Sequence, residues 1–149
     1  MKAIIKYFSL CILCFCYFIS ISQNAVIDSL KQVIKSRKED TLKVKALNKL
    51  GISLTKINKY DSSIVYANAA YELSQKLKFD RGISGALYNL ATAYYRKNDL
   101  ITAVDYFTKL AEVEKRRGSK KGLAGAYGNM GIIFETFGNY PKAQEYYFM

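Results

Sequence analysis

Apolar residues recur at three- and four-residue spacings along most of this chain, which places them on one face of successive α-helices. The pattern begins at about Ala25 and continues nearly to the last residue. It predicts helices over about Ala25–Ser36, from Asp40 or Thr41 to Ile57, and over Tyr60–Leu77, Arg81–Arg96, Leu100–Arg117 and Lys121–Thr136, with a last helix from Tyr140. We therefore predict an all-α fold.

The ends of several helices have sequence signals of their own. Either Asp40 or Thr41 can cap the helix that follows it, and Pro141 suits the first turn of a helix, where its missing N–H is no loss. The last helix has about ten residues before the chain stops, and its final residues 146–149 are apolar or aromatic. Because solenoids normally end in a polar capping helix, we expect a truncated chain or an end that a partner covers.

The helices repeat as pairs with a period of 40 residues. Residues 46–51 (Ala-Leu-Asn-Lys-Leu-Gly) return in related form at 86–91 and again at 126–131. This predicts three helical hairpins, over residues 40–79, 80–119 and an incomplete 120–149, after a covering helix in 24–39. A fixed period in this range is typical of stacked repeats, which present concave binding surfaces and rarely carry chemistry.

Small and large residues alternate in the same register in all three units. The small positions, which let helices approach closely, are Gly51, Ala91 and Gly131 in the first helices and Ser63, Ala103 and Ala143 in the second. The first unit departs most from the pattern, because Ser63 stands where the others have Ala and Ala67 where they have an aromatic residue. We expect its hairpin to be packed less tightly.

This pattern resembles the tetratricopeptide repeat (TPR) in its 40-residue form, over about residues 40–149. The resemblance implies a right-handed α-solenoid of antiparallel helix hairpins, here with the last hairpin truncated. It also implies a non-catalytic scaffold that binds a protein or peptide. The opening Ile27–Leu30, the segment Asp40–Val44 and the repeats together resemble the N-terminal region of exported Bacteroidetes-type sensor proteins.

In the TPR family the first helix of each unit lines a concave groove. Carried over to this chain, the resemblance assigns peptide binding to Lys49, Tyr88, Asn89, Thr92, Tyr95, Arg96 and Asn129, with Lys45, Asn48, Ile52, Lys56, Ile132 and Glu135 also lining the groove. Asn89 and Asn129 stand where an amide often bonds a bound peptide backbone, although Asn is also common there for other reasons. The carboxylate clamp of chaperone-binding members is not matched, since Ile52, Gly125 and Asn129 replace its expected residues.

Glycines recur every third residue in the first helix of the third unit, at 122, 125, 128 and 131. Each interior Gly costs about 1 kcal/mol of helix stability relative to Ala. Two explanations stay open, close packing of the helix or a bare backbone that a ligand can approach. A phosphate-binding loop is excluded, because the glycines fall inside a helix and no Gly-Lys-Ser/Thr follows.

The N-terminus has the features of an export signal. Lys2 and Lys6 precede an apolar run over about residues 7–21, which suits a signal peptide and is short for a membrane span. We predict a signal peptide over residues 1–23 and a periplasmic or cell-envelope location. An uncleaved N-terminal membrane anchor is the alternative, and membrane contact is otherwise expected only from a missing downstream segment.

Composition excludes several chemistries. The chain has no histidine, and its three cysteines lie within the first 16 residues. Catalytic triads and His or Cys metal sites are therefore excluded, and we expect no enzyme activity, no metal and no cofactor. The net charge of +11 favours acidic partners. The densest run, at residues 115–121, is explained by a helix C-terminus, so we expect no nucleic-acid binding.

Two functions remain open from the sequence. One is a free-standing exported scaffold that binds a protein or peptide. The other is the N-terminal sensor segment of a membrane signalling protein, such as a histidine kinase or a helix-turn-helix regulator, whose effector part is absent from this chain. Self-association through the apolar last helix is a further expectation.

Overall fold

The chain folds as a stack of antiparallel helices. The computed structural model describes residues 24–149, and this part of the chain contains no strand. Residues 24–36 are helical, and the helices that follow are α2 (Thr41–Lys56), α3 (Tyr60–Lys76), α4 (Asp80–Arg96), α5 (Leu100–Arg116), α6 (Lys120–Thr136) and α7 (Tyr140–Tyr147). The predicted all-α repeat fold is confirmed, with bounds within one residue of those expected. The predicted signal peptide lies outside the described residues.

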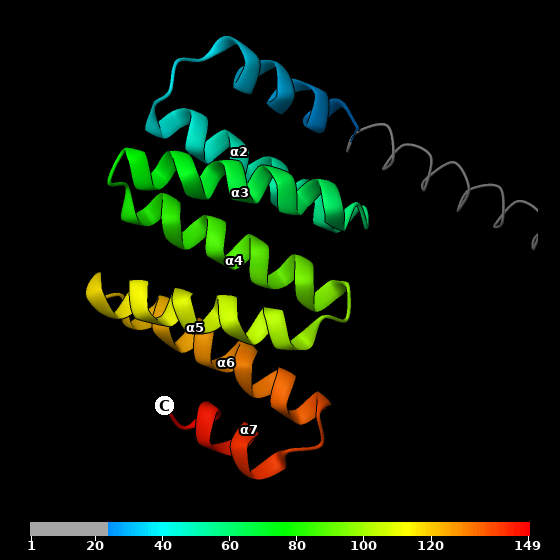
Figure 1. Ribbon diagram of the computed structural model, residues 1–149, viewed down its shortest axis with the longest axis vertical. Coiled ribbons are helices and arrows are strands. Elements are labelled where there is room, and N and C mark those ends of the chain that lie inside the picture. The colour runs from blue at the N-terminus through cyan, green and yellow to red at the C-terminus, as the bar shows by residue number, and fades with distance from the viewer. Residues whose placement is uncertain (1–23) are drawn as a thin grey trace, which may run out of the picture.

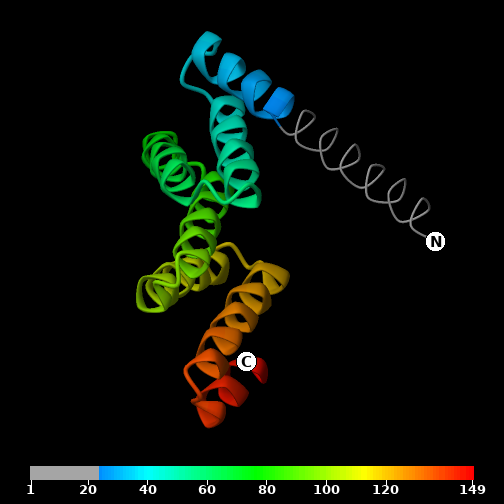
Figure 2. The same cartoon turned by 90° about the vertical axis from the view of Figure 1, so that its right-hand side faces the viewer.

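Successive helices pack against one another down the long axis of the molecule, from residues 24–36 to α7 (Figure 1). The first helices of the units, α2, α4 and α6, follow one another along the molecule, while α3 and α5 lie to one side of them (Figure 2). Helix α2 also packs directly on α4, whereas α4 and α6 make no packing contact of similar extent. The repeat is therefore regular along the chain but not in the spacing of its first helices.

All five turns between α2 and α7 have the same backbone geometry. The central residue of each turn is in the left-handed region, with φ between 52° and 73°, and these residues are Asn58, Lys78, Asn98, Gly118 and Gly138. In each turn the next residue donates its N–H to a carbonyl five residues earlier, as Lys59 does to Leu54 at 2.9 Å. These Schellman caps satisfy carbonyls that the helix leaves free. At the level of the backbone, the structure therefore repeats every 20 residues.

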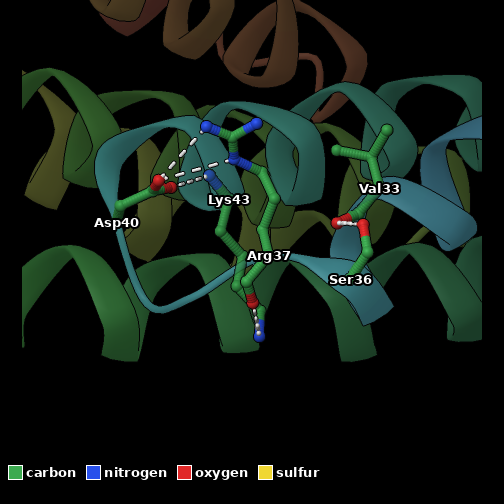
Figure 3. A network of polar contacts seen from close by, with 5 residues as sticks. All are labelled: Val33, Ser36, Arg37, Asp40 and Lys43. Carbon is green, nitrogen blue, oxygen red and sulfur yellow. Dashed lines mark hydrogen bonds and ion pairs between the residues drawn. The ribbon is translucent and has the colours of Figure 1, made fainter.

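Helix starts are capped by side chains in four of the six helices α2–α7. The Asp40 carboxylate accepts from the Lys43 backbone N–H at 2.7 Å and also contacts the guanidinium of Arg37 (Figure 3). The hydrogen bond from Lys43 is the main reason that the pKa of Asp40 lies below its usual value. Of the two predicted caps, Asp40 is therefore the one used.

The predicted small positions lie inside the stack. Ala91 and Ala103 are fully buried, and a Cβ atom on Gly131 would collide with the Tyr147 ring. Ser63 is also fully buried, and its hydroxyl donates to the Gly51 carbonyl at 2.8 Å. This bond ties α3 to α2, so the looser packing expected at Ser63 does not occur.

The helix at residues 24–36 covers the outer face of the first hairpin. Ile27 is only 5% exposed and packs with Leu50 and Leu54 of α2, and Ile34 packs against the same cluster. The helix at residues 24–36 thereby removes the apolar face of α2 from water on the side away from α4. Burial of apolar surface of this kind is the main favourable term in folding.

Candidate functional site

Two hollows lie along the first helices of the units and meet at α4. One, of about 350 Å³, lies between α2 and α4 and is lined by Ile52, Thr55, Lys56, Asn58, Tyr88, Asn89, Thr92 and Arg96. The other, of about 360 Å³, extends towards α6 and is lined by Asn48, Ile52, Ser84, Gly85, Tyr88, Asn89, Leu110, Glu114, Lys121, Gly122, Gly125 and Ala126. We call these the α2–α4 hollow and the α4–α6 hollow. They share Ile52, Tyr88 and Asn89.

The α2–α4 hollow combines cations with polar and apolar groups. Lys56 and Arg96 are both exposed on its rim, and no carboxylate lines it. Among the described residues neither cation forms an ion pair. Because no residue of the described range 24–149 pairs with these charges, the hollow favours an anionic group on a ligand.

Asn89 lies at the floor where the hollows meet and is only 2% exposed. Its Nδ2 atom donates to the backbone carbonyl of Asn48 at 2.9 Å and to Asn48 Oδ1 at 3.2 Å. Since a backbone carbonyl can only accept a hydrogen bond, the group of Asn89 that faces it must be the NH2 group. This fixes the orientation of the Asn89 side-chain amide, so its oxygen Oδ1 points away from the Asn48 carbonyl. Within the described residues, Oδ1 of Asn89 takes part in no hydrogen bond. Every fully buried side-chain oxygen in this part of the chain has a hydrogen-bond partner. Oδ1 is therefore not fully buried, and it reaches the groove surface.

Tyr88 lines both hollows. It occupies in α4 the register position that Asn48 occupies in α2, 40 residues earlier. Tyr88 is 44% exposed, and its ring forms a T-shaped pair with Phe107 on α5, with ring centroids 6.3 Å apart. Asn48 instead bonds Gly82 of α4 at 3.1 Å and draws the helices together. Among the described residues Tyr88 makes no comparable hydrogen bond to α6.

The glycines of α6 divide into two kinds. Added Cβ atoms on Gly122 and Gly131 would collide with Glu114 and Tyr147. The same atoms on Gly125 and Gly128 would meet nothing within 4 Å. Close packing therefore accounts for the first pair. The second pair leaves bare backbone beside open space, and Gly125 lies in the wall of the α4–α6 hollow.

A buried carboxylate lies at one end of the α4–α6 hollow. Glu114 is 4% exposed, and Arg117 donates to it at 2.5 Å while also donating to the Ser84 hydroxyl at 3.0 Å. Burial alone would raise the pKa of Glu114, but hydrogen bonds from Ser84 and Ser119 and the charge of Arg117 outweigh burial and hold the pKa below its usual value. Glu114 is therefore a neutralised structural charge.

The structure brings four of the seven predicted site residues together. Tyr88, Asn89, Thr92 and Arg96 line the α2–α4 hollow. The other three lie elsewhere. Lys49 is exposed on α2 outside both hollows, Tyr95 packs partly buried against the core, and Asn129 donates to Gly125 of its own helix at 2.7 Å.

Sequence reasoning missed several residues of the α4–α6 hollow, namely Ser84, Gly85, Leu110, Glu114, Lys121 and Ala126. Glu114 had a signal, because it lies directly beside Val113 in a helix whose buried positions include Leu110 and Ala111. An acidic residue at such a place needs a partner to be tolerated. Arg117, three residues on, is that partner.

The described residues 24–149 hold no group of three or more His, Cys, Asp or Glu side chains placed to bind a metal ion. Within that same range, no helix combines the length and the apolar character needed to cross a bilayer.

The fold and the groove define a helical-repeat scaffold of hairpin units. Residues 82–147 match the tetratricopeptide repeat family model, so this part of the chain consists of tetratricopeptide repeats. This family consists in general of non-catalytic scaffolds for protein–protein interaction. The chain is also 36% identical over 58 residues to response regulator aspartate phosphatase H of Bacillus subtilis (strain 168), a match that spans 39% of this chain and 15% of that protein.

Solved structures show the same fold at low sequence identity. A Rap protein in complex with competence and sporulation factor is similar with a TM-score of 0.74 and 22% identity, over 85% of this chain and 35% of that one. The TPR domain of Arabidopsis FLU gives a TM-score of 0.66 and 22% identity, over 70% of this chain and 87% of that one. The apo form of RapI gives 0.71 and 16% identity, over 87% of this chain and 48% of that one.

Proposed function

We propose that this chain is a non-catalytic module that binds an extended protein segment in the groove centred on Tyr88. The observation that carries the proposal is the α2–α4 hollow. It places two cations without ion pairs, Lys56 and Arg96, beside an aromatic ring and the free Oδ1 atom of Asn89. An amide oxygen can accept a backbone N–H of an extended segment, and the cations favour an acidic side chain on it.

The comparisons support binding of this kind. The similar Rap protein was solved in complex with competence and sporulation factor, and tetratricopeptide repeats form concave binding surfaces. The predicted export signal adds that the partner is an exported or cell-envelope protein. Localisation of the tagged chain by fractionation checks this part of the proposal.

Site-specific photo-crosslinking tests the groove directly. Tyr88 replaced by the photoreactive analogue benzoylphenylalanine keeps an aromatic ring in place and should crosslink a discrete protein in cells of the source organism. Ile101 is the matched control, because it lies on α5 outside both hollows and is 73% exposed. Arg96→Glu in the Tyr88 variant should abolish the crosslink. Equal crosslinking from both positions, or none from Tyr88, would contradict the proposal.

A second function is favoured by the relatives. The chain spans 15% of the length of the phosphatase that it resembles and 35% of the Rap chain. We propose as the alternative that it is the sensor segment of a larger signalling protein. Sequencing the DNA beyond residue 149 decides this, since a stop codon with no following signalling frame would exclude it.

A further inference from the structure

We infer that the α4–α6 hollow is a pocket for one apolar side chain of the bound segment, and that the segment carries an acidic residue two or three positions from that side chain. The inference rests on the proposed function and specifies its ligand. The two hollows differ in chemistry, although they share Ile52, Tyr88 and Asn89.

The accessible lining of the α4–α6 hollow is almost entirely apolar. Leu110 and Ala126 contribute to it, and the bare backbone of Gly125 opens one wall because no atom approaches within 4 Å of its missing Cβ position. Tyr88 also lines the pocket. An apolar side chain placed there would be removed from water on several sides, which is favourable in proportion to the buried area.

Charge assigns the acidic residue of the segment to the other hollow. The α4–α6 hollow is lined by one cation, Lys121, and by the carboxylate of Glu114, whose charge Arg117 already neutralises. Glu114 is itself 4% exposed and bonded by Arg117, so it offers little to an incoming cation. The α2–α4 hollow instead has two cations, Lys56 and Arg96, and no carboxylate in its lining, so it attracts an anion more strongly. The segment therefore lies with its acidic residue over α2–α4 and its apolar residue over α4–α6.

The spacing follows from α4, which lines both hollows. Its contributing residues span 88–96 in the first hollow and 84–89 in the second. The centres of these spans are between five and six residues apart, or about 8 Å along the helix axis at about 1.5 Å per residue. An extended chain advances about 3.3 Å per residue, and the sideways step from one hollow to the other adds to the path. Two or three residues of the segment cover this distance. The Oδ1 atom of Asn89 lies between, where it can accept a backbone N–H.

Selection from a random-peptide display library on the immobilised full chain tests this inference. The expected consensus is an acidic residue separated by two or three positions from a Leu, Ile, Met or aromatic residue. The chain has no tryptophan, so synthetic peptides with Trp at the apolar position should report burial as a blue shift in their fluorescence.

Two glycine variants form a matched pair. Gly125→Leu fills the α4–α6 hollow. It should remove the preference for an apolar residue in the selected peptides and weaken the affinity for the selected peptide about ten- to hundredfold. Gly128→Leu also adds a side chain in open space, but outside the hollow. It should leave the apolar preference and the affinity for the peptide unchanged. Thermal unfolding confirms that both variants are folded.

The outcomes separate the inference from the proposed function. Peptides that share an acidic residue but no apolar one, or a Gly125→Leu variant that keeps the apolar preference, would overturn the pocket and leave the groove intact. No consensus at all would overturn both. If light scattering showed a dimer that Gly125→Leu abolishes, a second copy of the chain would fill the hollow, and the peptide assignment would be wrong.

Discussion

The Nδ2 atom of Asn89 donates to the backbone carbonyl of Asn48 at 2.9 Å, and this bond joins α4 to α2 across the floor of the groove. Its counterpart one repeat later, Asn129, donates instead to Gly125 within its own helix at 2.7 Å. The two asparagines share a register position in the repeat, yet only the first connects two units. This difference distinguishes a tight junction between units from an open one.

The first prediction compares these asparagines. Asn89→Ala should lower the free energy of unfolding by about 1–3 kcal/mol, because it leaves the Asn48 amide and carbonyl without their buried partner. Asn129→Ala should change it by less than about 0.5 kcal/mol, since its bond lies within a partly exposed helix face. Urea unfolding of both variants measures the difference. Equal losses would show that Asn129 also bridges two helices.

The second prediction concerns glycines at equivalent positions, Gly85 and Gly125. Gly125→Ala should raise the free energy of unfolding by about 1 kcal/mol, because Ala favours the helix and the new methyl group meets nothing. Gly85→Ala should give no such gain, since its Cβ would lie 2.9 Å from Nδ2 of Asn48 and disturb the bonds of that amide. The same stabilisation in both variants would mean that the α2–α4 junction is as open as the α4–α6 junction.

The third prediction follows from the turn at Lys78, which has a φ of 52°. A side chain with a Cβ atom is strained in this region, whereas glycine is not. Lys78→Gly should therefore raise the free energy of unfolding by about 0.5–1 kcal/mol. Lys115→Gly, inside α5, should lower it by about 1 kcal/mol. Thermal unfolding distinguishes them, and destabilisation by Lys78→Gly would contradict the turn geometry.

The fourth prediction concerns pH and Glu114. Its pKa is lower in the folded chain than the ordinary value of 4.5, so the folded state binds fewer protons than the unfolded state. The stability that it contributes is therefore present above pH 4.5 and is lost as the pH falls through the folded pKa. Glu114→Gln should lower stability at neutral pH by about 1.5–3 kcal/mol and flatten the loss of stability in acid.

The control for this experiment is Glu112→Gln, an exposed change on the same helix. It should follow the wild-type curve when unfolding is measured from about pH 6.5 to about pH 3. A Glu114→Gln curve parallel to that of the wild type would show that Glu114 is not held ionised by Ser84, Ser119 and Arg117.

The helices and their stacking could be predicted from the sequence because their signals are local. Periodicity set the helix bounds to within one residue, and small residues such as Ala91 and Gly131 marked where helices approach. The 20-residue repeat of the turns was less visible. Lys78 adopts the same left-handed conformation as Gly118 without being a glycine, because the flanking helices impose it.

The candidate site was harder to predict, because register gives a position on a helix but not what faces it. Asn89 and Asn129 were equivalent in sequence, and their different roles depend on what the preceding unit presents. The side-chain amide of Asn48 in α2 faces Asn89. For Asn129, the residue at the position equivalent to Asn48 is Tyr88, whose side chain is an aromatic ring. A contact between units of this kind has no signal within either unit alone.

The most direct test of the groove is amide chemical-shift mapping by NMR with the peptide selected on the full chain. If the groove binds the peptide, the largest shifts should fall on α2, α4 and α6 around Tyr88, Thr92 and Gly125, while exposed residues of α3 and α5 such as Val65 and Ile101 stay unchanged. Shifts concentrated on α3 and α5 instead would contradict the account.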